Sequence, residues 1–278
     1  MNQTNGNNKY SVLMSVYKND NPQYLIQAID SMLNQTIKAE QFVIVEDGPV
    51  GEDIEEVIRH YEKDNKLFTI VRLEKNGGLG NALNQGFKVC RNELIARMDA
   101  DDISKPERCE KQLKTFAKNP GLVILGTQIE EFIGTTDNVV SSRKVPTTYE
   151  EIKKFARRRS PFNHPTVMYK KNSILALGGY MTYGRKEDLD LFIRAVNNGC
   201  FSGNLRETLL YYRTSDDNLR RRKTWINCKE YIQIIWGFFR KGYCGISDVV
   251  YVIAGQIVMF LFPSQITVKM TKKFLRSE

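Results

Sequence analysis

The sequence predicts an α/β fold with a mainly parallel sheet and helices on both faces. Two patterns indicate it. Short apolar segments alternate with amphipathic segments through the first half of the chain, and each apolar segment ends in a polar or glycine-containing turn. Parallel strands need helical crossovers between them, which this alternation supplies. At 278 residues the chain is long enough to bury a sizeable core.

The expected elements are clear in the first half and weaker after residue 126. We expect strands at 10–16, 42–46, 67–73, 93–98 and 122–126, and helices at 22–34, 53–63, 81–90 and 105–118. Ser104 reads as the N-cap of the last of these helices, with Glu107 closing a capping box. Later we expect strands and loops over 130–147, a basic helix over 149–159, a loop and short strand over 161–169, a helix over 186–198 and a strand over 207–212.

The chain divides near Thr214. We expect a disordered polar segment over 1–9, an α/β domain over 10–214 and a basic, helical extension over 215–278. The apolar run over 249–262 is shorter than the ~20 residues that span a bilayer. Beyond it, Ile266, Met270 and Phe274 recur every four residues opposite basic side chains, as in a helix lying on a membrane surface. Alternatively, these helices pack on the domain as ordinary core.

The charge is concentrated at the end of the chain. The net charge is +9, and most of the excess of Lys and Arg over Asp and Glu falls after residue 200. A basic end mixed with apolar runs favours an anionic membrane surface over nucleic acid. The five cysteines are scattered without a CxxC pair, which suits reduced thiols, and the polar N-terminus has no signal-peptide pattern. We therefore expect a cytoplasmic protein at the inner face of the membrane.

Three acids follow the fourth predicted strand, as Asp99, Asp101 and Asp102. In open α/β sheets ligands bind outside the carboxyl ends of the strands. Three neighbouring carboxylates repel one another unless a cation offsets the repulsion, and Mg²⁺ and Mn²⁺ favour carboxylate and phosphate oxygens. The run therefore predicts a metal-bridged nucleotide diphosphate. A solvated acidic loop that caps the next helix is the alternative.

Two further turns belong to the same predicted crevice. The first strand ends at Ser15-Val16-Tyr17 and leads into a helix N-terminus, where backbone N–H groups favour a nucleotide. The second strand ends at Asp47, a carboxylate that could accept the imide N–H of a uracil. Each turn is weak evidence by itself. In consecutive strand–helix units they describe one site.

An acceptor side is indicated further along the chain. Glu187 and Asp188 begin the helix predicted at 186–198, where a carboxylate could deprotonate a hydroxyl as a general base. Complementing the helix dipole is the alternative role of such acids. His164 lies in a loop that could line the acceptor or metal side, or it is a structural histidine.

Together, these motifs resemble glycosyltransferase family 2 over about residues 10 to 213. The resemblance rests on Ser11–Tyr17, Val45–Gly48, Asn76–Asn84, Met98–Asp102 with Pro106 and Arg108, and Gly178–Tyr180 followed by Glu187 and Asp188. It implies a GT-A fold, a nucleotide-sugar donor, usually a UDP-sugar, and inversion at the anomeric carbon. Ser15 stands where a proline is often found, and Glu46 replaces the first acid of an Asp-Asp pair. These departures concern only the fit of the donor base.

The resemblance also assigns roles to single positions. Asp101 would ligate Mn²⁺ or Mg²⁺ with help from Asp99, and Asp188, with Glu187 beside it, would be the base. The donor would be contacted by the following residues: Ser15, Val16, Tyr17, Asp47, Asn76, Asn81, Arg97, Asp99 and Ala100. His164 is the candidate on the acceptor side.

The expected reaction moves a UDP-hexose or UDP-N-acetylhexosamine sugar onto a glycan or lipid-linked glycan in cell-surface polysaccharide synthesis. Two alternatives stay open. One is a sugar-phosphate nucleotidyltransferase, although its usual basic glycine-rich loop is absent after the first strand. The other is a non-catalytic module that uses the basic tail on membranes or nucleic acid. The acidic crevice argues against nucleic acid.

Overall fold

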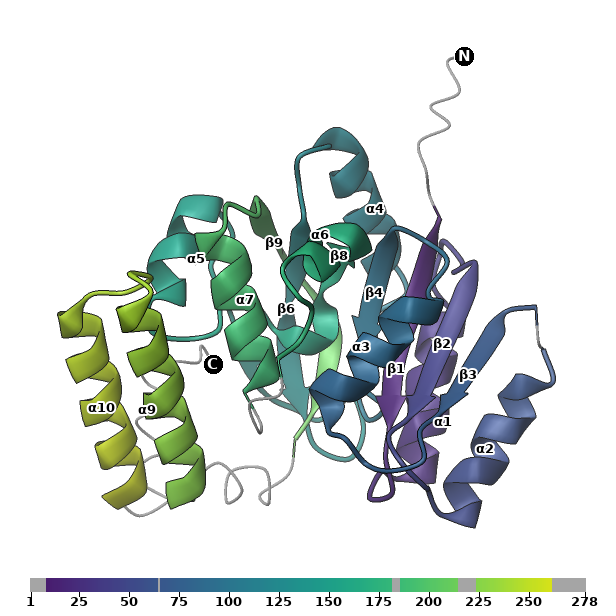
Figure 1. The fold of residues 1–278 in the computed structure, drawn as a ribbon. Coiled ribbons are helices and arrows are strands. Elements are labelled where there is room, and N and C mark those ends of the chain that lie inside the picture. Colours follow the sequence, from purple (N-terminus) through teal and green to yellow (C-terminus); the bar gives the residue numbers. More distant parts are fainter. Residues whose placement is uncertain (1–8, 65, 182–185, 215–223, 262–278) are drawn as a thin grey trace.

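The structure is a computed structural model that describes residues 9–64, 66–181, 186–214 and 224–261 (Figure 1). Its strands are β1 (Tyr10–Val16), β2 (Gln41–Glu46), β3 (Phe68–Arg72), β4 (Leu94–Met98), β5 (Ile103–Ser104), β6 (Ile124–Phe132), β7 (Val139–Arg143), β8 (Met168–Lys170) and β9 (Ser202–Arg213). Its α-helices are α1 (Pro22–Leu33), α2 (Glu52–Glu62), α3 (Leu79–Val89), α4 (Arg108–Lys118), α5 (Tyr149–Ala156), α6 (Lys171–Ala176), α7 (Glu187–Asn197), α9 (Trp225–Arg240) and α10 (Ile246–Leu261), with a short 3₁₀-helix η1 (His164–Thr166). The predicted disordered segment 1–9 lies almost wholly outside the described residues.

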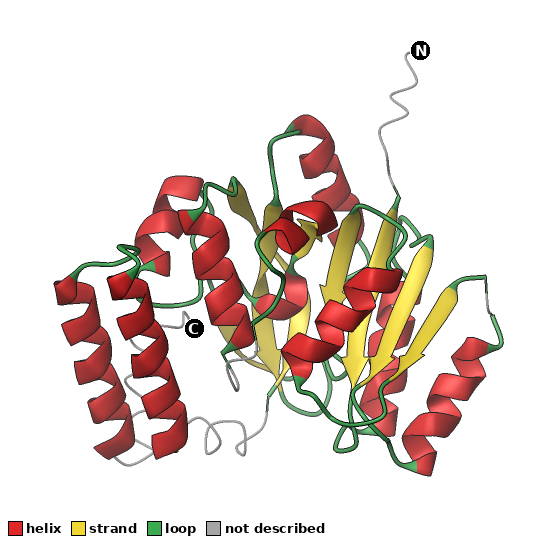
Figure 2. Cartoon of the chain, in the orientation of Figure 1, coloured by secondary structure: helices red, strands yellow, loops and turns green. Residues whose placement is uncertain are grey.

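The first four long strands confirm the predicted parallel arrangement. β1 pairs in parallel with β2 and with β4, and β2 pairs in parallel with β3. Side chains alternate across the sheet: Val12 and Met14 pack with α1, α2 and α4, whereas Leu13 packs with α3 and α7 on the other face (Figure 2). In the strand order β3-β2-β1-β4 the chain adds β2 and β3 on one side of β1 and then crosses to add β4 on the other side, so the order of strands reverses between β1 and β4. That switch point is where open α/β sheets bind ligands.

The remainder of the sheet is mixed. The order continues β4-β8-β6-β9-β5, and β7 pairs antiparallel with the second half of β6 off this path. β8 runs antiparallel to both β4 and β6, whereas β6 and β9 are parallel. Both β6 and β9 are longer than the predicted strands at 122–126 and 207–212. Most of their extra residues are polar or glycine, so the pairing of β6 with β9, rather than an apolar pattern, makes them strands.

The predicted capping box at Ser104 is wrong. Ser104 lies in β5, which pairs with β9, and its hydroxyl accepts a hydrogen bond from Gln35 at 3.1 Å. The helix begins only at Arg108, after an N-cap at Glu107 that makes no side-chain cap. Arg108 is instead buried and donates to the carbonyls of Arg97 and Pro165 at 3.1 and 2.9 Å. Tertiary pairing therefore overrides the local capping signal.

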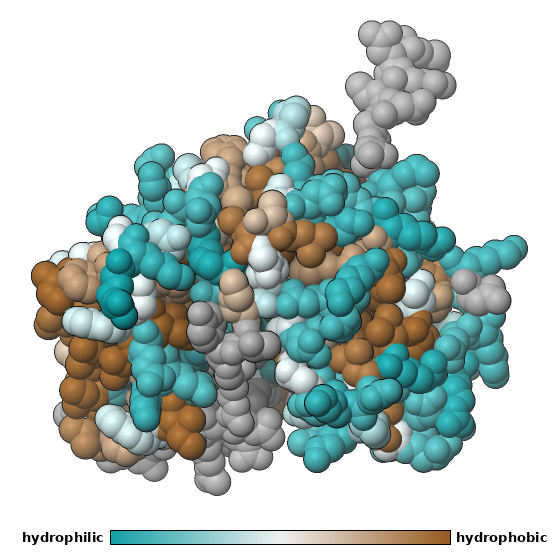
Figure 3. Space-filling view, in the orientation of Figure 1, coloured by the Kyte–Doolittle hydropathy of each residue, from teal (hydrophilic) through white to brown (hydrophobic). Residues whose placement is uncertain are grey.

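The C-terminal extension packs on the domain and also exposes apolar surface. α9 and α10 lie side by side next to α7 and α5 (Figure 1), and Phe238 and Val249 are buried in the same core cluster as α3 and α7. An ion pair of 2.6 Å joins Arg158 to Asp248 of α10. Hydrophobic side chains nevertheless gather on the surface over both helices (Figure 3). The exposed ones are Trp225, Ile226, Trp236, Ile246, Val250, Tyr251, Ile257, Phe260 and Leu261.

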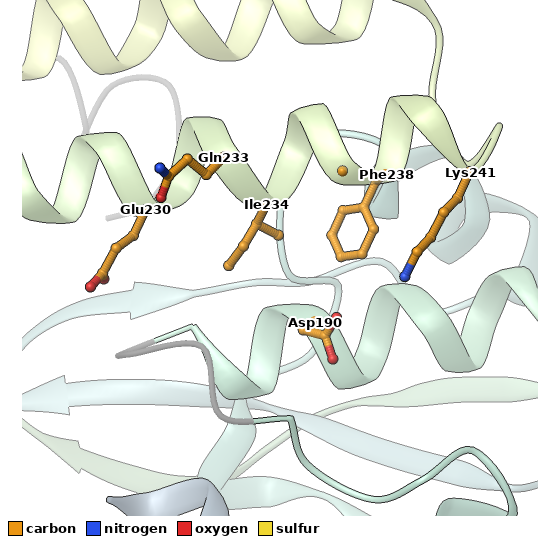
Figure 4. Close-up of a pocket in the computed structure, with 7 residues that line it drawn as sticks. Asp190, Glu230, Gln233, Ile234, Phe238 and Lys241 are labelled. Carbon is orange, nitrogen blue, oxygen red and sulfur yellow. The ribbon is translucent and has the colours of Figure 1, made fainter.

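The contact between α9 and α7 is not continuous. A cavity of about 430 Å³ separates them, with Phe238 and Lys241 pointing from α9 toward Asp190 of α7 (Figure 4). No helix in the described part of the chain is long and apolar enough to cross a membrane. The predicted amphipathic run at Ile266, Met270 and Phe274 lies outside the described residues.

Candidate active site

The three acids after β4 converge at the switch point. The carboxylate oxygens of Asp99, Asp101 and Asp102 lie within 4.8 Å of one another. Asp101 is exposed, Asp99 is partly buried and Asp102 is fully buried. Converging carboxylate oxygens are the ligand set that Mg²⁺ and Mn²⁺ prefer. The cluster therefore fits a divalent cation, with Asp101 and Asp99 the accessible ligands.

The carboxylates of this cluster repel one another when no cation is bound. Desolvation, followed by the charge of Asp99, raises the pKa of Asp101 to about 6. Asp20, which sequence reasoning missed, also faces this charge: burial, with further contributions from Asp101 and Asp99, raises its pKa to about 7. Its carboxylate accepts from the amide of Tyr17 at 2.9 Å.

Arg213 fixes the acidic loop from the end of β9. Its amide donates to Asp102 Oδ1 at 2.9 Å, and its Nε donates to the carbonyl of Asp101 at 2.8 Å. Its other guanidinium nitrogens donate to the carbonyl of Gly134 and to Gln27 Oε1 at 3.1 and 2.6 Å. Asp102 is thus an anchor for β9 and not the cap of α4. No local signal identifies Arg213, since it lies 111 residues from Asp102.

A buried arginine, Arg97, contacts the acidic cluster. It is 1 % exposed and forms an ion pair with Asp99, while its Nε and Nη1 are buried without a hydrogen bond. Asp99 is therefore held by a buried guanidinium, which fixes its carboxylate and supplies a positive charge beneath the metal candidate. In this structure Arg97 orients Asp99 and does not reach the surface that a donor would touch.

The predicted donor turns at the ends of β1 and β2 lie beside the acids. Val16 is buried, whereas Ser15 and Tyr17 are partly exposed where β1 ends. The carboxylate of Asp47 accepts from the amides of Gly77 and Gly78 at 2.7 and 2.9 Å. Each carboxylate oxygen keeps a further acceptor site for a ligand N–H.

The glycine-containing loop completes this wall. Asn76 donates to the carbonyl of Asp47 at 3.0 Å, and the side chain of Asn81 lies against Gly77. Ala100 is 7 % exposed, between the acids. The turn after β2 and the loop before α3 therefore hold each other in place.

The acids of α7 meet the N-terminus of α3. A Cβ added at Gly80 would lie 3.2 Å from Cβ of Glu187, closer than an ordinary van der Waals contact, so glycine at this position favours the close approach of the two helices. Asn84 of α3 donates to the carbonyl of Tyr180 at 2.7 Å and accepts from its amide at 2.9 Å. Gly179, with φ +67°, leaves room for Asn84. Motifs about a hundred residues apart are thereby brought to one crevice.

Burial raises the pKa of both acids at the start of α7. Burial, and then the charge of Asp188, raises the pKa of Glu187 to about 7. Burial also raises the pKa of Asp188, against the stabilising amide of Leu189. Glu187 Oε2 is buried without a hydrogen bond. A carboxylate with a raised pKa is a better proton acceptor for a hydroxyl near neutral pH.

His164 lies in η1, next to Tyr180 and to Phe192 of α7. Its Nε2 is 2.8 Å from the hydroxyl of Tyr180, and its ring packs on Phe192. Burial, followed by the charge of Arg97, moves the pKa of His164 well below its usual range, so the ring is neutral. In this arrangement His164 supports Tyr180.

Arg194 was also missed by sequence reasoning. It donates to the carbonyls of Leu177 and Gly179 at 2.6 and 2.7 Å and to Asp190 at 2.6 Å. It therefore fixes the turn that carries Tyr180. The (i, i+4) spacing of Asp190 and Arg194 on a predicted helix was a signal that could have found the pair.

Comparison with known proteins gives consistent results. The model of the family described as "Glycosyl transferase family 2" matches residues 11–190. An uncharacterized glycosyltransferase of Haemophilus influenzae is 37 % identical over 96 % of this chain and 99 % of its own length. An Escherichia coli protein named UDP-Gal:alpha-D-GlcNAc-diphosphoundecaprenol beta-1,3-galactosyltransferase is 34 % identical over 96 % of this chain and 97 % of its own. The Amylovoran biosynthesis glycosyltransferase AmsE of Erwinia amylovora is 36 % identical over 81 % of this chain and 84 % of its own.

Solved structures share the fold. TarS 1–349 of S. aureus in complex with UDP-GlcNAc has a TM-score of 0.66 at 16 % identity, covering 95 % of this chain and 77 % of that one. The mannosyltransferase PcManGT of Pyrobaculum calidifontis, in complex with GDP-Man and Mn²⁺, has a TM-score of 0.61 at 12 % identity, covering 95 % and 79 %. The expected GT-A fold is confirmed.

Proposed function

Because the chain belongs to glycosyl transferase family 2, we propose that it transfers a hexose or N-acetylhexosamine from a UDP-linked donor to a glycan hydroxyl, with inversion. One observation carries the proposal. The contact of Gly80 with Glu187 brings the acid pair of α7, buried Glu187 and partly exposed Asp188, to the donor loop before α3, which contacts the turn after β2. The acids after β4 face the same switch point. A leaving-group site and a base therefore adjoin one crevice.

The chain's own residues divide the reaction between them. Asp101 and Asp99 would hold Mn²⁺ or Mg²⁺, which supplies positive charge for the leaving diphosphate. Asp188 takes the proton of the acceptor hydroxyl, whose oxygen attacks the sugar C1 while the C1–O bond to the diphosphate breaks. The electron pair of that bond leaves with UDP. Attack from the face opposite the leaving group inverts the anomeric centre.

A lipid-linked glycan is the proposed acceptor. The E. coli relative is named for an acceptor sugar carried on diphosphoundecaprenol, and the match covers nearly all of both chains. We place the reaction in cell-surface polysaccharide synthesis, at the cytoplasmic face of an anionic membrane. Ile246, Val250, Ile257 and Leu261 recur at helical spacing and are between 44 % and 68 % exposed along α10. Such a stripe suits the membrane–water interface.

Donor turnover tests the reaction. The purified full chain is incubated with Mn²⁺, a panel of UDP-sugars and a short-chain alkyl diphosphate carrying GlcNAc. We expect release of UDP and one new glycoside by mass spectrometry with one or few of the donors. Release of pyrophosphate from UTP and a sugar phosphate, without glycoside formation, would establish the nucleotidyltransferase alternative.

Vesicle binding tests the membrane part. We expect Val250→Glu with Ile257→Glu to lose sedimentation with phosphatidylglycerol vesicles and to keep transfer to a water-soluble acceptor. Ile133→Glu, at a position 44 % exposed away from α10, is the matched control. Equal sedimentation of all three proteins would contradict membrane binding through α10.

A further inference from the structure

A second cavity lies between α5 with its following turn and α10. Its volume is about 690 Å³. Four basic side chains line it, those of Lys154, Arg157, Arg158 and Arg159, together with two acids, Glu151 and Asp248. Neither the donor loops nor the acids after β4 contribute to this lining.

Both acids of the cavity are already engaged. Asp248 is paired with Arg158 at 2.6 Å and accepts from the amide of Gly245 at 3.0 Å. Glu151 is the far member of a capping box, and its carboxylate accepts from the amide of Thr148 at 3.2 Å. Within the described residues, none of Lys154, Arg157 and Arg159 forms an ion pair with a carboxylate. The cavity thus holds a surplus of positive charge.

Part of this positive charge is withdrawn from water. Arg159 is half-buried with its guanidinium 4.7 Å from the ring of Phe155. Burial, with a further contribution from the charge of Arg143, lowers the pKa of Arg159. Arg143, which does not line the cavity but whose charge acts on Arg159, carries a buried Nε without a hydrogen bond. Partly desolvated guanidinium groups without carboxylate partners are costly, and a phosphate oxygen is the anion whose geometry they match.

One tyrosine of α9, Tyr231, links the cavity to the start of α7, because its ring centre lies 5.6 Å from Nζ of Lys186, next to the proposed acids. The positive charge of Arg143 acts on Asp188, for which burial is the larger influence on the pKa. The charges of Arg159 and Asp188 both influence the pKa of Tyr231, for which burial is the larger influence. The hydroxyl of Tyr231 donates a hydrogen bond to the carbonyl of Arg158 at 2.8 Å. An anion bound in the cavity would therefore stand close to the acceptor side of the active site.

The opposite wall of the cavity belongs to α10. Tyr251 lines the cavity, with the guanidinium of Arg158 4.5 Å from its ring centre. The same tyrosine is 60 % exposed and lies along α10 between Val250 and the later exposed residues Ile257 and Leu261. The helix α10 therefore carries both a wall of the basic cavity and the exposed apolar stripe.

We propose that this cavity binds the diphosphate of a polyprenyl-diphosphate-linked acceptor, with the lipid chain leaving over α10 and the sugar reaching toward Asp188. The chemistry of the protein matches the parts of such an acceptor: hydrocarbon, diphosphate, sugar. This inference rests on the proposed function, because it assigns a site to the acceptor of that reaction.

Direct binding provides the first test. Farnesyl diphosphate is titrated into the full chain by calorimetry, with farnesol and inorganic diphosphate as separate probes. For the double variant Arg157→Gln with Arg159→Gln we expect the Kd for farnesyl diphosphate to rise at least about tenfold, because one or more charge-assisted hydrogen bonds to the diphosphate are lost. Farnesol should bind equally to both proteins. Lys153→Gln, an exposed change on α5 outside the cavity, is the matched control.

A second variant guards against a folding defect. Arg157 is exposed, so Arg157→Gln alone leaves packing intact and should still weaken farnesyl diphosphate severalfold. Unchanged Kd values in both variants would overturn the assignment. The assignment would also be overturned if a variant lost binding to phosphatidylglycerol vesicles and kept its affinity for farnesyl diphosphate, because the cavity would then bind lipid headgroups.

Kinetics separate this inference from the proposed function. With a GlcNAc-diphosphate acceptor the double variant should raise KM at least about tenfold and leave KM for the UDP-sugar unchanged. With an octyl glycoside that lacks the diphosphate, both proteins should perform alike. An equal loss on both acceptors would overturn a phosphate role. Arginine-dependent binding of farnesyl diphosphate without turnover of any donor would refute the proposed reaction and leave the anion site standing.

Discussion

The two halves of the site are built differently. On the donor side, Tyr17, Asp47 and Asp99 each follow their own parallel strand, so they reach one edge of the sheet through the local strand–helix repeat. On the acceptor side, Glu187 is placed by its contact with Gly80, and Tyr180 by its hydrogen bonds with Asn84. The donor side is set by order along the chain. The acceptor side is set by contacts between distant segments.

This difference suggests which parts of the chain determine its substrate specificity. A repeated strand–helix frame can serve any nucleotide-linked sugar, whereas α5 with its flanking turns and α10 line the cavity proposed for the acceptor. The variants below test that division, from the largest expected effect to the smallest.

The largest effect is expected on the acceptor side, from Asp188→Asn. Removal of the base should lower the rate of transfer by about 10²- to 10⁴-fold, while the Kd for UDP stays unchanged because Asp188 lies on α7 and not on a donor loop. The checks are stopped-flow transfer rates and UDP calorimetry. Normal transfer would remove Asp188 as the base.

On the donor side the corresponding change is Asp101→Ala. Without this accessible carboxylate the leaving diphosphate loses its cation, and UDP release should fall by about a hundredfold or more. UDP release is followed while Mn²⁺ is titrated. Asp137→Ala, at an exposed acid in the loop before β7, should behave like the unaltered protein. Full activity of Asp101→Ala without added metal would contradict the metal site.

A change that crosses the two halves is Arg213→Ala. It removes hydrogen bonds to Gln27 and to the carbonyls of Asp101 and Gly134, so we expect about 2–4 kcal/mol less stability. Mn²⁺ affinity should fall by about 10- to 100-fold, because the ligand loop is no longer held. Urea unfolding and Mn²⁺ calorimetry measure both. Arg206→Ala, an exposed change on the same strand, is the control; equal Mn²⁺ affinities would separate β9 from the donor site.

The smallest effect concerns Glu187 and pH. Because its folded pKa of about 7 exceeds the ordinary 4.5, the folded state holds an extra proton between these values, and stability falls as pH rises through this window. Glu187→Gln removes the penalty, so its advantage should grow from near zero at pH 4.5 to at most about 3 kcal/mol at pH 8. Urea unfolding across this range gives the values. A pH-independent difference, like that of exposed Glu150→Gln, would mean that Glu187 is not strained by burial.

Several site residues could be read from the sequence, and the reason is physical. Asp99 and Asp101 follow a short apolar strand, and residues at the carboxyl ends of parallel strands share one edge of the sheet. Ser104 shows the limit of such reasoning. Its capping pattern is intact, yet β5 pairs with β9 and the helix starts later, because a hydrogen-bonded ladder to a distant strand outweighs one local cap.

The sequence by itself determined the parallel frame of β1–β4, the acidic cluster and the family, because periodicity and order along the chain encode them. Tertiary structure alone decided that Asp102 anchors β9, that His164 faces Tyr180, and that α5 and α10 enclose a basic cavity. Each of these depends on segments far apart in the chain, whose meeting is fixed by packing and hydrogen bonding across the whole core. No local pattern records such a meeting.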